Sequence, residues 1–240
     1  MQYQAEELLI CVIARLLKGC RHIAVGVSSP IPGSAALLSR ALNEAKRVSI
    51  IGSHNPEFRT DGGIDLFDSA AQGRIDAFFL GGGQIDGKAN INLVGIGDYP
   101  QQKVRWSGSF GSAFLYFLVP RVILFREEHT SRVLVPKVDF ISAPGVSDPG
   151  VYRPGGPHAL LTGRCLFSFN KERQRFRLTS VHPGHTVEEV RANTGFVFDC
   201  PDQVPRTAPP EPEILALMRT TVAQQIADPY PQFAKRVWHV

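Results

Sequence analysis

Residues 77–86 read Ala77-Phe78-Phe79-Leu80-Gly81-Gly82-Gly83-Gln84-Ile85-Asp86, so a short apolar run leads directly into three glycines. Four apolar residues in succession are typical of a strand in a parallel sheet that is covered on both faces. Glycine costs about 0.5–1 kcal/mol relative to alanine inside a regular element. Three in succession therefore indicate backbone that turns sharply or approaches another group closely. Because open parallel sheets bind ligands beyond the carboxyl ends of their strands, we expect a binding loop here.

Strands and helices alternate on both sides of this segment. Apolar residues at helical spacing predict a helix over residues 8–17, ended by Gly19, and a second helix over 34–45. Short apolar runs between such helices predict an α/β fold with an open, mostly parallel sheet flanked by helices. The expected strands lie at residues 22–27, 48–51, 77–80, 122–125 and 138–141, and a third helix lies at 65–72.

The C-terminal third has a different character, with many prolines and glycines. We expect a β-hairpin there, followed by a proline-rich connector at 201–212 and a helical extension. The sequence thus predicts one α/β domain over residues 1–200 and an extension over residues 201–240 that packs on it. The expected elements are a loop at 147–158, hairpin strands at 165–170 and 175–181, a helix at 186–193, a closing strand at 196–199, a helix at 213–226 and a polar tail.

The composition is that of an ordinary globular protein. The 240 residues are 43% hydrophobic and carry a net charge of +4 that is spread along the chain, which argues against nucleic-acid binding. The most apolar window, 114–125, is too short to cross a bilayer, and Glu6 and Glu7 precede the first apolar run, unlike a signal peptide. Four cysteines without a CxxC pair indicate reduced thiols. We expect a cytoplasmic protein that binds neither nucleic acid nor a membrane.

Polar side chains follow the three glycines closely. Gln84, Asp86, Asn90 and Asn92 can fix the orientation of a ligand by hydrogen bonds, while the glycine backbone can bring N–H groups to an anion or a thioester oxygen. Tight turns without any ligand use the same residue types and are the alternative.

Several separated motifs resemble those of the β subunits of class I CoA-transferases, most closely the glutaconate CoA-transferase type. The resemblance covers roughly residues 10–230, and Ala89 departs from it, because the family usually has glycine there. The motifs are Val25-Gly26 with Pro30 and Gly33, Gly82-Gly83-Gln84-Ile85-Asp86 with Asn90-Ile91-Asn92, Gly97-Asp98-Tyr99, Lys103-Val104-Arg105, Ser107-Gly108-Ser109, Lys137-Val138-Asp139 with Ser142-Ala143-Pro144-Gly145, Thr194-Gly195-Phe196 and Asp228-Pro229.

The resemblance implies the open α/β fold of these enzymes, a heteromer with an α subunit, and an active site at the subunit interface. It implies an acyl-CoA substrate, with coenzyme A present as part of that substrate and no tightly bound cofactor. It also places backbone N–H groups of residues 107–111 near the thioester as an oxyanion hole; a plain turn before Ser112 is the alternative. The substrate-binding residues that we expect are Gly82, Gly83, Gln84, Asp86, Asn90, Asn92, Ser107, Gly108, Ser109 and Gly111.

The nucleophile of true transferases is missing. Their glutamate follows the third strand and attacks the thioester, and the matching position here is Ile50 or Gly52. The segment resembles instead two relatives with other chemistry: a CoA-dependent ring-cleaving hydrolase whose working glutamate lies on the other subunit, and a methylglutaconyl-CoA decarboxylase. The decarboxylase has a Gly-Ser-x-x-Pro-Glu sequence similar to residues 52–57, but its cysteine nucleophile is absent here.

We therefore expect the essential carboxylate to come from the α subunit, and hydrolase, lyase or decarboxylase chemistry on a carboxylated acyl-CoA; genuine CoA transfer is the alternative. Within the chain, the candidate catalytic residues are Ser53, His54 and Glu57. Histidine can exchange a proton near neutral pH, and Ser53 can donate to a substrate carboxylate or cap the turn. For His54, a solvent-facing role is the alternative.

Two further clusters have simpler explanations. Lys171, Arg173, Arg175 and Arg177 on the expected hairpin are interpreted as a solvated face, with contact to CoA phosphates as the alternative. His182 and His185 lie near each other, but no third ligand is evident, so we expect no metal site.

Two other classes of protein share the architecture. Sugar-responsive transcription regulators use it as a non-catalytic sensor of phosphorylated sugars, and they carry a helix-turn-helix ahead of that domain, whereas this chain opens with the domain's first helix. Sugar-phosphate isomerases also share it, but lack the Gly82–Asp86 and Gly97-Asp98-Tyr99 motifs.

Overall fold

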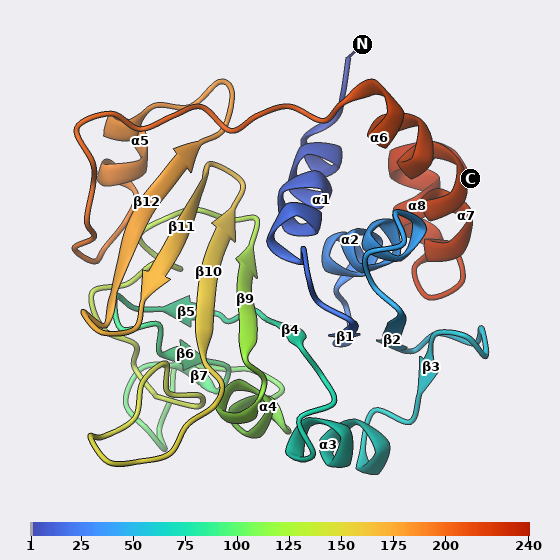
Figure 1. Cartoon of the computed structure of the whole chain (residues 1–240). Helices are drawn as coiled ribbons and strands as arrows, with labels where there is room; N and C mark the ends of the chain where they lie inside the picture. The colour runs from blue at the N-terminus through green and yellow to red at the C-terminus, as the bar shows by residue number, and fades with distance from the viewer. Residues whose placement is uncertain (1) are drawn as a thin grey trace. The chain divides into compact units, whose positions relative to one another are not determined.

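The computed structural model describes residues 2–240, which form two compact units (Figure 1). The terminal unit contains the residues up to Phe79 together with Ala208–Val240, and the central unit is Leu80–Thr207. The chain therefore starts and ends in the same unit. The expected division into a domain over residues 1–200 and an extension over 201–240 stays a prediction, although residues 208–240 do pack with the start of the chain.

Four parallel strands form the sheet of the terminal unit, in the order β4, β1, β2, β3. β1 lies between β4 and β2, and its Ile23 pairs with Val48 of β2 and with Ala77 of β4. Every residue of β1 and β4 is buried, which is expected of parallel strands that are covered on both faces. The bounds are β1 (His22–Val25), β2 (Arg47–Ile51), β3 (Arg59–Thr60) and β4 (Ala77–Leu80).

Helices from both ends of the chain pack in this unit. In Figure 1 the red C-terminal helices lie beside the blue α2, and the close approach requires Gly33: a Cβ there would meet the Ile226 side chain at 3.1 Å. Proline at the first position of α2 costs nothing, because that N–H has no helical partner. The helices are α1 (Ala5–Leu16), α2 (Pro30–Ala41), α3 (Ile64–Ala71), α6 (Pro212–Leu217), the π-helical turn η1 (Met218–Val222), α7 (Ala223–Ile226) and α8 (Pro231–Trp238).

A buried ion pair joins α1 to the C-terminal helices. The Glu7 side chain is fully buried, and Arg219 donates to both of its oxygens at 2.7 and 2.8 Å, while Trp238 donates to it at 3.2 Å. Burial alone would raise the pKa of Glu7, but these hydrogen bonds outweigh it and the pKa is lowered. A buried carboxylate needs such partners, so the pair fixes the position of residues 208–240 on α1.

The central unit combines parallel and antiparallel strands. β9 (Arg121–Arg126) pairs in parallel with β10 (Pro157–Thr162), and β11 (Cys165–Asn170) continues the sheet antiparallel to β10 and pairs with β12 (Arg175–Val181) as a hairpin. Figure 1 shows these four strands side by side. Two small antiparallel ladders and two short helices complete the unit: β5 (Gln84–Ile85) with β6 (Ile91–Asn92), β7 (Gly95–Ile96) with β8 (Val104–Arg105), α4 (Ser112–Leu118) and α5 (Val187–Ala192).

The predicted α/β class with a mostly parallel sheet, hairpin and C-terminal helices is confirmed. The strand expected at 138–141 is wrong: its backbone is held by the Gln84 side chain at Asp139 N and by single contacts of residues 142–143 with Ile91, so no ladder forms. The closing strand at 196–199 is also wrong, because only Asp199 bridges to β12.

β10, α8 and several two-residue strands are not predicted from the sequence. β10 begins at Pro157, within the segment predicted as a loop, and α8 forms in the polar tail, where the sequence predicts no helix. In α8, Phe233, Ala234 and Val237 are buried, and Pro231 begins the helix rather than preventing it. Among residues 2–240, no helix is long and apolar enough to cross a bilayer.

Candidate functional site

The three glycines after β4 pack against the chain itself. A Cβ at Gly83 would overlap the ring of Trp106, and one at Gly82 would lie 2.7 Å from the Ile91 side chain. The Gly83 N–H donates to the Asn92 carbonyl at 2.9 Å. Close approach within the central unit is therefore a sufficient reason for glycine at both positions. A contact of Gly82 or Gly83 with substrate stays a prediction.

Gln84 and Asn92 form one buried hydrogen-bonded pair across the β5–β6 ladder. Asn92 is fully buried and donates to the Gln84 Oε1 at 2.7 Å and to the Gly95 carbonyl at 2.7 Å. Gln84 Oε1 also accepts from the Asp139 N–H at 3.0 Å. These bonds hold three segments of the chain together, and substrate binding by the pair stays a prediction.

Asp86 and Asn90 close the turn that joins β5 to β6. The Asp86 carboxylate accepts from Asn90 Nδ2 at 3.0 Å and from the backbone N–H groups of Lys88 and Asn90 at 3.0 and 3.1 Å. Asn90 Oδ1 accepts from Gly145 N–H at 3.1 Å. Ala89 adopts a φ of +59°, so the turn keeps the left-handed conformation that glycine favours although its residue departs from the family pattern.

The loop at residues 107–111 is largely exposed and leads into α4. Gly108 has a φ of +101°, which favours glycine, and Phe110 is 88% exposed. The Ser112 N–H donates to the Ser109 carbonyl at 2.8 Å at the start of α4. The loop is thus open to an incoming group. An oxyanion hole formed by Ser107, Gly108, Ser109 and Gly111 stays a prediction.

The loop at residues 52–57, after β2, is organised by Asp228. Ser53 is buried and its hydroxyl donates to the Asp228 Oδ2 at 2.6 Å, and the N–H groups of His54 and Asn55 donate to the same oxygen at 2.9 and 3.2 Å. Burial alone would raise the pKa of Asp228, but these hydrogen bonds outweigh it and lower the pKa. Asp228 is therefore an anion that shapes the loop.

His54 and Glu57 extend from this loop in different environments. The His54 side chain is 89% exposed, and its Nδ1 lies 3.3 Å from the Asp228 Oδ1. Glu57 forms an ion pair with Arg40 at 2.9 Å. The loop thus brings Ser53 and His54 together at one carboxylate, whereas Glu57 contacts α2. Their catalytic roles stay predictions.

Neither position expected to match the transferase glutamate carries a reactive group. Ile50 is completely buried in β2, and Gly52 has a φ of +91° just beyond the strand. The ionisable groups at this loop are instead His54 and Glu57, together with Asp228 from the C-terminal segment.

The sequence matches a known protein family over most of its length. Residues 7–193 match the model of the family described as Coenzyme A transferase. The chain belongs to this family. Similar members include the B subunit of the 3-oxoadipate CoA-transferase of Pseudomonas knackmussii, with 32% identity over 94% of this chain and 95% of the relative. The B subunit of the glutaconate CoA-transferase of Acidaminococcus fermentans is 32% identical over 92% of each chain.

A hydrolase is also among the relatives. The cholesterol ring-cleaving hydrolase IpdB subunit of Rhodococcus jostii is 32% identical over 64% of this chain and 62% of the relative. The crystal structure of Rhodococcus jostii IpdAB superposes with a TM-score of 0.79 at 23% identity, over 100% of both chains. The glutaconate CoA-transferase structure superposes with a TM-score of 0.80 at 22% identity, over 100% of this chain and 98% of that one. At these identities the structures show a shared fold. The relatives identified by sequence are enzymes that include transferases and a hydrolase.

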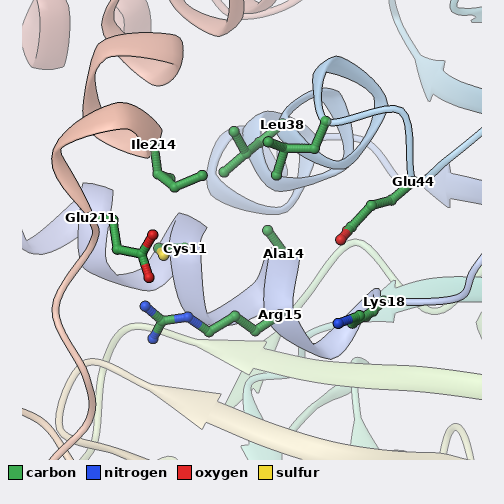
Figure 2. A pocket seen from close by; sticks show the side chains of 9 residues that line it. Cys11, Ala14, Arg15, Lys18, Leu38, Glu44, Glu211 and Ile214 are labelled. Atoms are coloured by element: carbon green, nitrogen blue, oxygen red, sulfur yellow. The ribbon is translucent and has the colours of Figure 1, made fainter.

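Of two cavities in the described residues, one is lined by predicted substrate-binding residues and the other is not. The cavity in Figure 2 has a volume of about 230 Å³, lies between α1, α2 and α6, and contains none of them. Its walls are largely apolar, and the side chains of Leu38 and Ile214 face each other across it. The Arg15 guanidinium also lines the cavity and donates to the carbonyls of Ala208 and Pro209. The second cavity, in the central unit, is lined by Asp86 and Asn90 and has a volume of about 640 Å³.

Some residues of the site carry little signal in the sequence. Asp228 stands out only as part of a matching motif. The residues around it in the sequence do not indicate that its carboxylate accepts hydrogen bonds from the 52–57 loop. Lys88 and Lys137 line the larger cavity. Lys137 stands out only within a matching motif, and Lys88 resembles an isolated surface charge in the sequence. Trp106 was missed, although a tryptophan near a glycine-rich segment is a usable signal for close packing.

The two histidines near residue 184 are separate. His182 is buried and contacts Thr207 and the Thr162 carbonyl, whereas His185 contacts Glu189 at 3.0 Å. Within residues 2–240 there is no cluster of three or more His, Cys, Asp or Glu side chains suited to a metal ion.

Proposed function

We propose that the chain is the β subunit of a heteromeric enzyme that acts on a carboxylated acyl-CoA thioester. Two relatives that match over more than nine-tenths of their length are B subunits of CoA-transferases, and their substrates are carboxylic acids by name. Four free cysteines, three of them buried, agree with a soluble cytoplasmic enzyme.

The reaction that we favour is hydrolysis, lyase chemistry or decarboxylation rather than CoA transfer. The observation that carries this preference is the residue pair Ile50 and Gly52, where the transferase glutamate would stand: one is core and the other has no side chain. Without that carboxylate the chain cannot form the acyl-enzyme anhydride on which transfer depends. A base or nucleophile must then come from the α subunit.

In this proposal the chain contributes pocket walls and hydrogen-bond donors. The open 107–111 loop offers backbone N–H groups to the thioester oxygen, where charge develops as the carbonyl is attacked. His54 is exposed, lies beside the Asp228 carboxylate, and can accept or return a proton once the α subunit has docked. Coenzyme A enters as part of the substrate, and no tightly bound cofactor is required.

Genuine CoA transfer is the second candidate, because both long relatives are transferases. A non-catalytic sugar-phosphate sensor is a remote third, and a chain that binds a sugar phosphate and ignores CoA would support it.

Copurification from the native source and borohydride trapping test the proposal together. The purified complex is incubated with an acyl-CoA, reduced, and the modified peptide is mapped. Thiol release and the mass of the remaining acyl-CoA are followed without any acceptor carboxylate. We expect turnover without an acceptor acid and no label on this chain: thioester hydrolysis releases free CoA, whereas lyase chemistry or decarboxylation changes the acyl group and leaves it esterified to CoA. A label on a carboxylate of this chain, with thioester exchange only when an acceptor acid is added, would establish transfer instead.

Glu57→Gln is the matched control for trapping, because Glu57 is the carboxylate of this chain among the three catalytic candidates. If a label on this chain disappears in Glu57→Gln, Glu57 is the nucleophile and the proposed import of a carboxylate from the α subunit is wrong. His54→Ala should lower turnover by about 100-fold or more if His54 transfers a proton.

A further inference from the structure

The larger cavity of the central unit has walls that are tied to one another. The Ile85 N–H donates to the Val133 carbonyl at 2.8 Å, the Val135 N–H donates back to Ile85 at 2.9 Å, and the Gly195 N–H donates to Leu134 at 2.7 Å. These bonds join the segments around residues 85, 135 and 195, all of which contribute to the cavity. Its volume of about 640 Å³ lies within the range of small-molecule sites, which is roughly 300–1,000 Å³. Backbone hydrogen bonds therefore hold these three walls of the cavity in place relative to one another.

Positive charge dominates its lining. Lys88, Lys137, Arg173 and Arg175 all line the cavity. The two arginines share Asp199 at 3.1 and 3.2 Å, and no ion-pair partner of Lys88 or Lys137 occurs within residues 2–240.

The one carboxylate in the lining does not neutralise the lysines by contact. Asp86 is buried and its oxygens are occupied by Asn90 and by the backbone N–H groups of Lys88 and Asn90. Counting Asp86 and Asp199 against the four cations leaves a surplus of positive charge at the cavity. Such a concave basic surface attracts anions, and two lysine ammonium groups suit phosphate.

An apolar strip lies in the same cavity. Val197 is 74% exposed, Ile141 is 49% exposed, and the buried Phe196 completes the strip in the lining. A purely inorganic anion would leave this strip in water. A ligand with phosphate groups at one end and a flat, weakly polar ring at the other would cover both parts.

We propose that this cavity binds a nucleotide, with its phosphates at Lys88 and Lys137 and its base against Ile141 and Val197. Two sources supply this chemistry: the nucleotide end of a coenzyme A ester, or a free adenine nucleotide acting as an effector. The first source rests on the proposed function, and the second does not.

Calorimetric titration of the full-length protein tests the site with adenosine 3′,5′-bisphosphate, ADP and coenzyme A as probes. The variant is Lys88→Ala/Lys137→Ala, which keeps the Lys88 backbone bond to Asp86 and removes only exposed side chains. The matched control is Lys46→Ala/Lys235→Ala, which removes two exposed lysines that do not line the cavity. Thermal unfolding of both variants verifies that they are folded.

We expect the dissociation constant of adenosine 3′,5′-bisphosphate to rise about tenfold or more in the cavity variant and to stay within about twofold in the control. Added salt should weaken binding to the wild type more than to the cavity variant. Equal affinities for the wild type and the cavity variant, or no binding of any probe to the wild type, would overturn the proposal.

The source is decided by competition. If coenzyme A displaces the bisphosphate and binds less tightly to the cavity variant, the site holds the substrate's nucleotide end. If ADP binds as tightly as adenosine 3′,5′-bisphosphate and coenzyme A does not displace either of them, the site binds a free nucleotide. An assembled enzyme that fails to turn over any acyl-CoA while ADP binding still depends on the lysines would reject the proposed function and retain the site.

Discussion

Asp228 determines the shape of the 52–57 loop from a position 173 to 175 residues later in the chain than its donors. Its Oδ2 accepts hydrogen bonds from Ser53, His54 and Asn55, and the lowered pKa shows that the fold favours the charged form. A carboxylate that serves three donors is difficult to replace, because its removal leaves donors without an acceptor.

Asp228→Asn should lower the free energy of unfolding by about 1–2 kcal/mol at neutral pH, since charge-assisted hydrogen bonds are weakened at a partly exposed site. The folded pKa lies below the unfolded one, so this contribution is present above the unfolded value and is lost as pH falls through the folded value. Urea unfolding at neutral and at acidic pH measures it, and the difference between variant and wild type should shrink in acid. The exposed Asp68 supplies the control Asp68→Asn, expected within about 0.5 kcal/mol of wild type. A difference that is independent of pH would contradict the assignment.

At this scale the sequence identifies the residues more reliably than their partners. Gln84, Asp86, Asn90 and Asn92 are predicted together, and they do form two bonded pairs. Their spacing predicts polar side chains beside a turn, but the identity of a distant partner such as Asp139 N–H or Gly145 N–H depends on segments 55 residues away. Local pattern carries no information about such distant partners.

Strands and helices with a strong period are predicted well, and elements that depend on tertiary contacts are not. β4, β11 and β12 have the predicted bounds, because their apolar residues alternate or run together between clear turn signals. The segment at 138–141 also has an apolar pattern, yet it bends at Asp139 and Phe140, and a hydrogen bond from the Asp139 N–H to the Gln84 side chain stands where a ladder was expected. β10 was missed because its start lies among glycines and prolines.

Two buried histidines connect the end of β10 to the residues that follow β12 and α5 and to Thr207 in the connector. His129 contacts Thr162 at 2.8 Å and Thr194 at 2.9 Å, and His182 contacts Thr207 at 2.8 Å and the Thr162 carbonyl at 3.0 Å. Burial, assisted by the nearby Arg164 charge, lowers the pKa of His129 to about 4. Burial likewise lowers the pKa of His182 to about 4. Both side chains are therefore neutral in the folded protein.

Acid should destabilise the central unit through these two side chains. Between pH about 6.5 and pH about 4 the unfolded chain takes up a proton at each histidine that the folded chain does not, so stability falls by about 1.4 kcal/mol per pH unit per histidine. His129→Gln and His182→Gln should each reduce the dependence of unfolding free energy on pH by about 1.4 kcal/mol per pH unit, the contribution of one proton. Denaturant unfolding across that pH range measures it. His239→Gln, at an exposed position, should leave the slope unchanged. An unaltered slope in both buried variants would falsify the account.

At the scale of the whole molecule, the start and end of the chain build one unit. The buried side chains Leu215, Met218, Val222 and Ile226 come from the segment Ala208–Val240, and the Glu7–Arg219 pair joins them to α1. The sequence predicts that residues 201–240 pack on the domain formed by residues 1–200, but its local patterns do not indicate that the first helices are their partners.

Truncation after Thr207 should unfold the terminal unit. Each of the four large buried side chains contributes about 1.5–3 kcal/mol, so their loss approaches the whole stability of a typical domain, about 5–15 kcal/mol. We expect loss of cooperative unfolding by circular dichroism and strong binding of a hydrophobic dye. Removal of His239 and Val240 alone is the matched control and should leave both signals unchanged. A truncated protein that melts cooperatively at the wild-type temperature would show that the C-terminal helices are dispensable.

Because the C-terminal helices pack on α1 and α2, the terminal unit can fold only late in translation. Residues 2–79 leave the ribosome before the helices that cover them, because those helices are made only after the contiguous segment Leu80–Thr207. At about 5–20 residues per second, the apolar surfaces of the first helices stay uncovered for roughly 6–26 seconds while Leu80–Thr207 is synthesised. During translation this interval makes the N-terminal segment a client for chaperones that shield exposed apolar helices, and a slowed ribosome would lengthen its exposure.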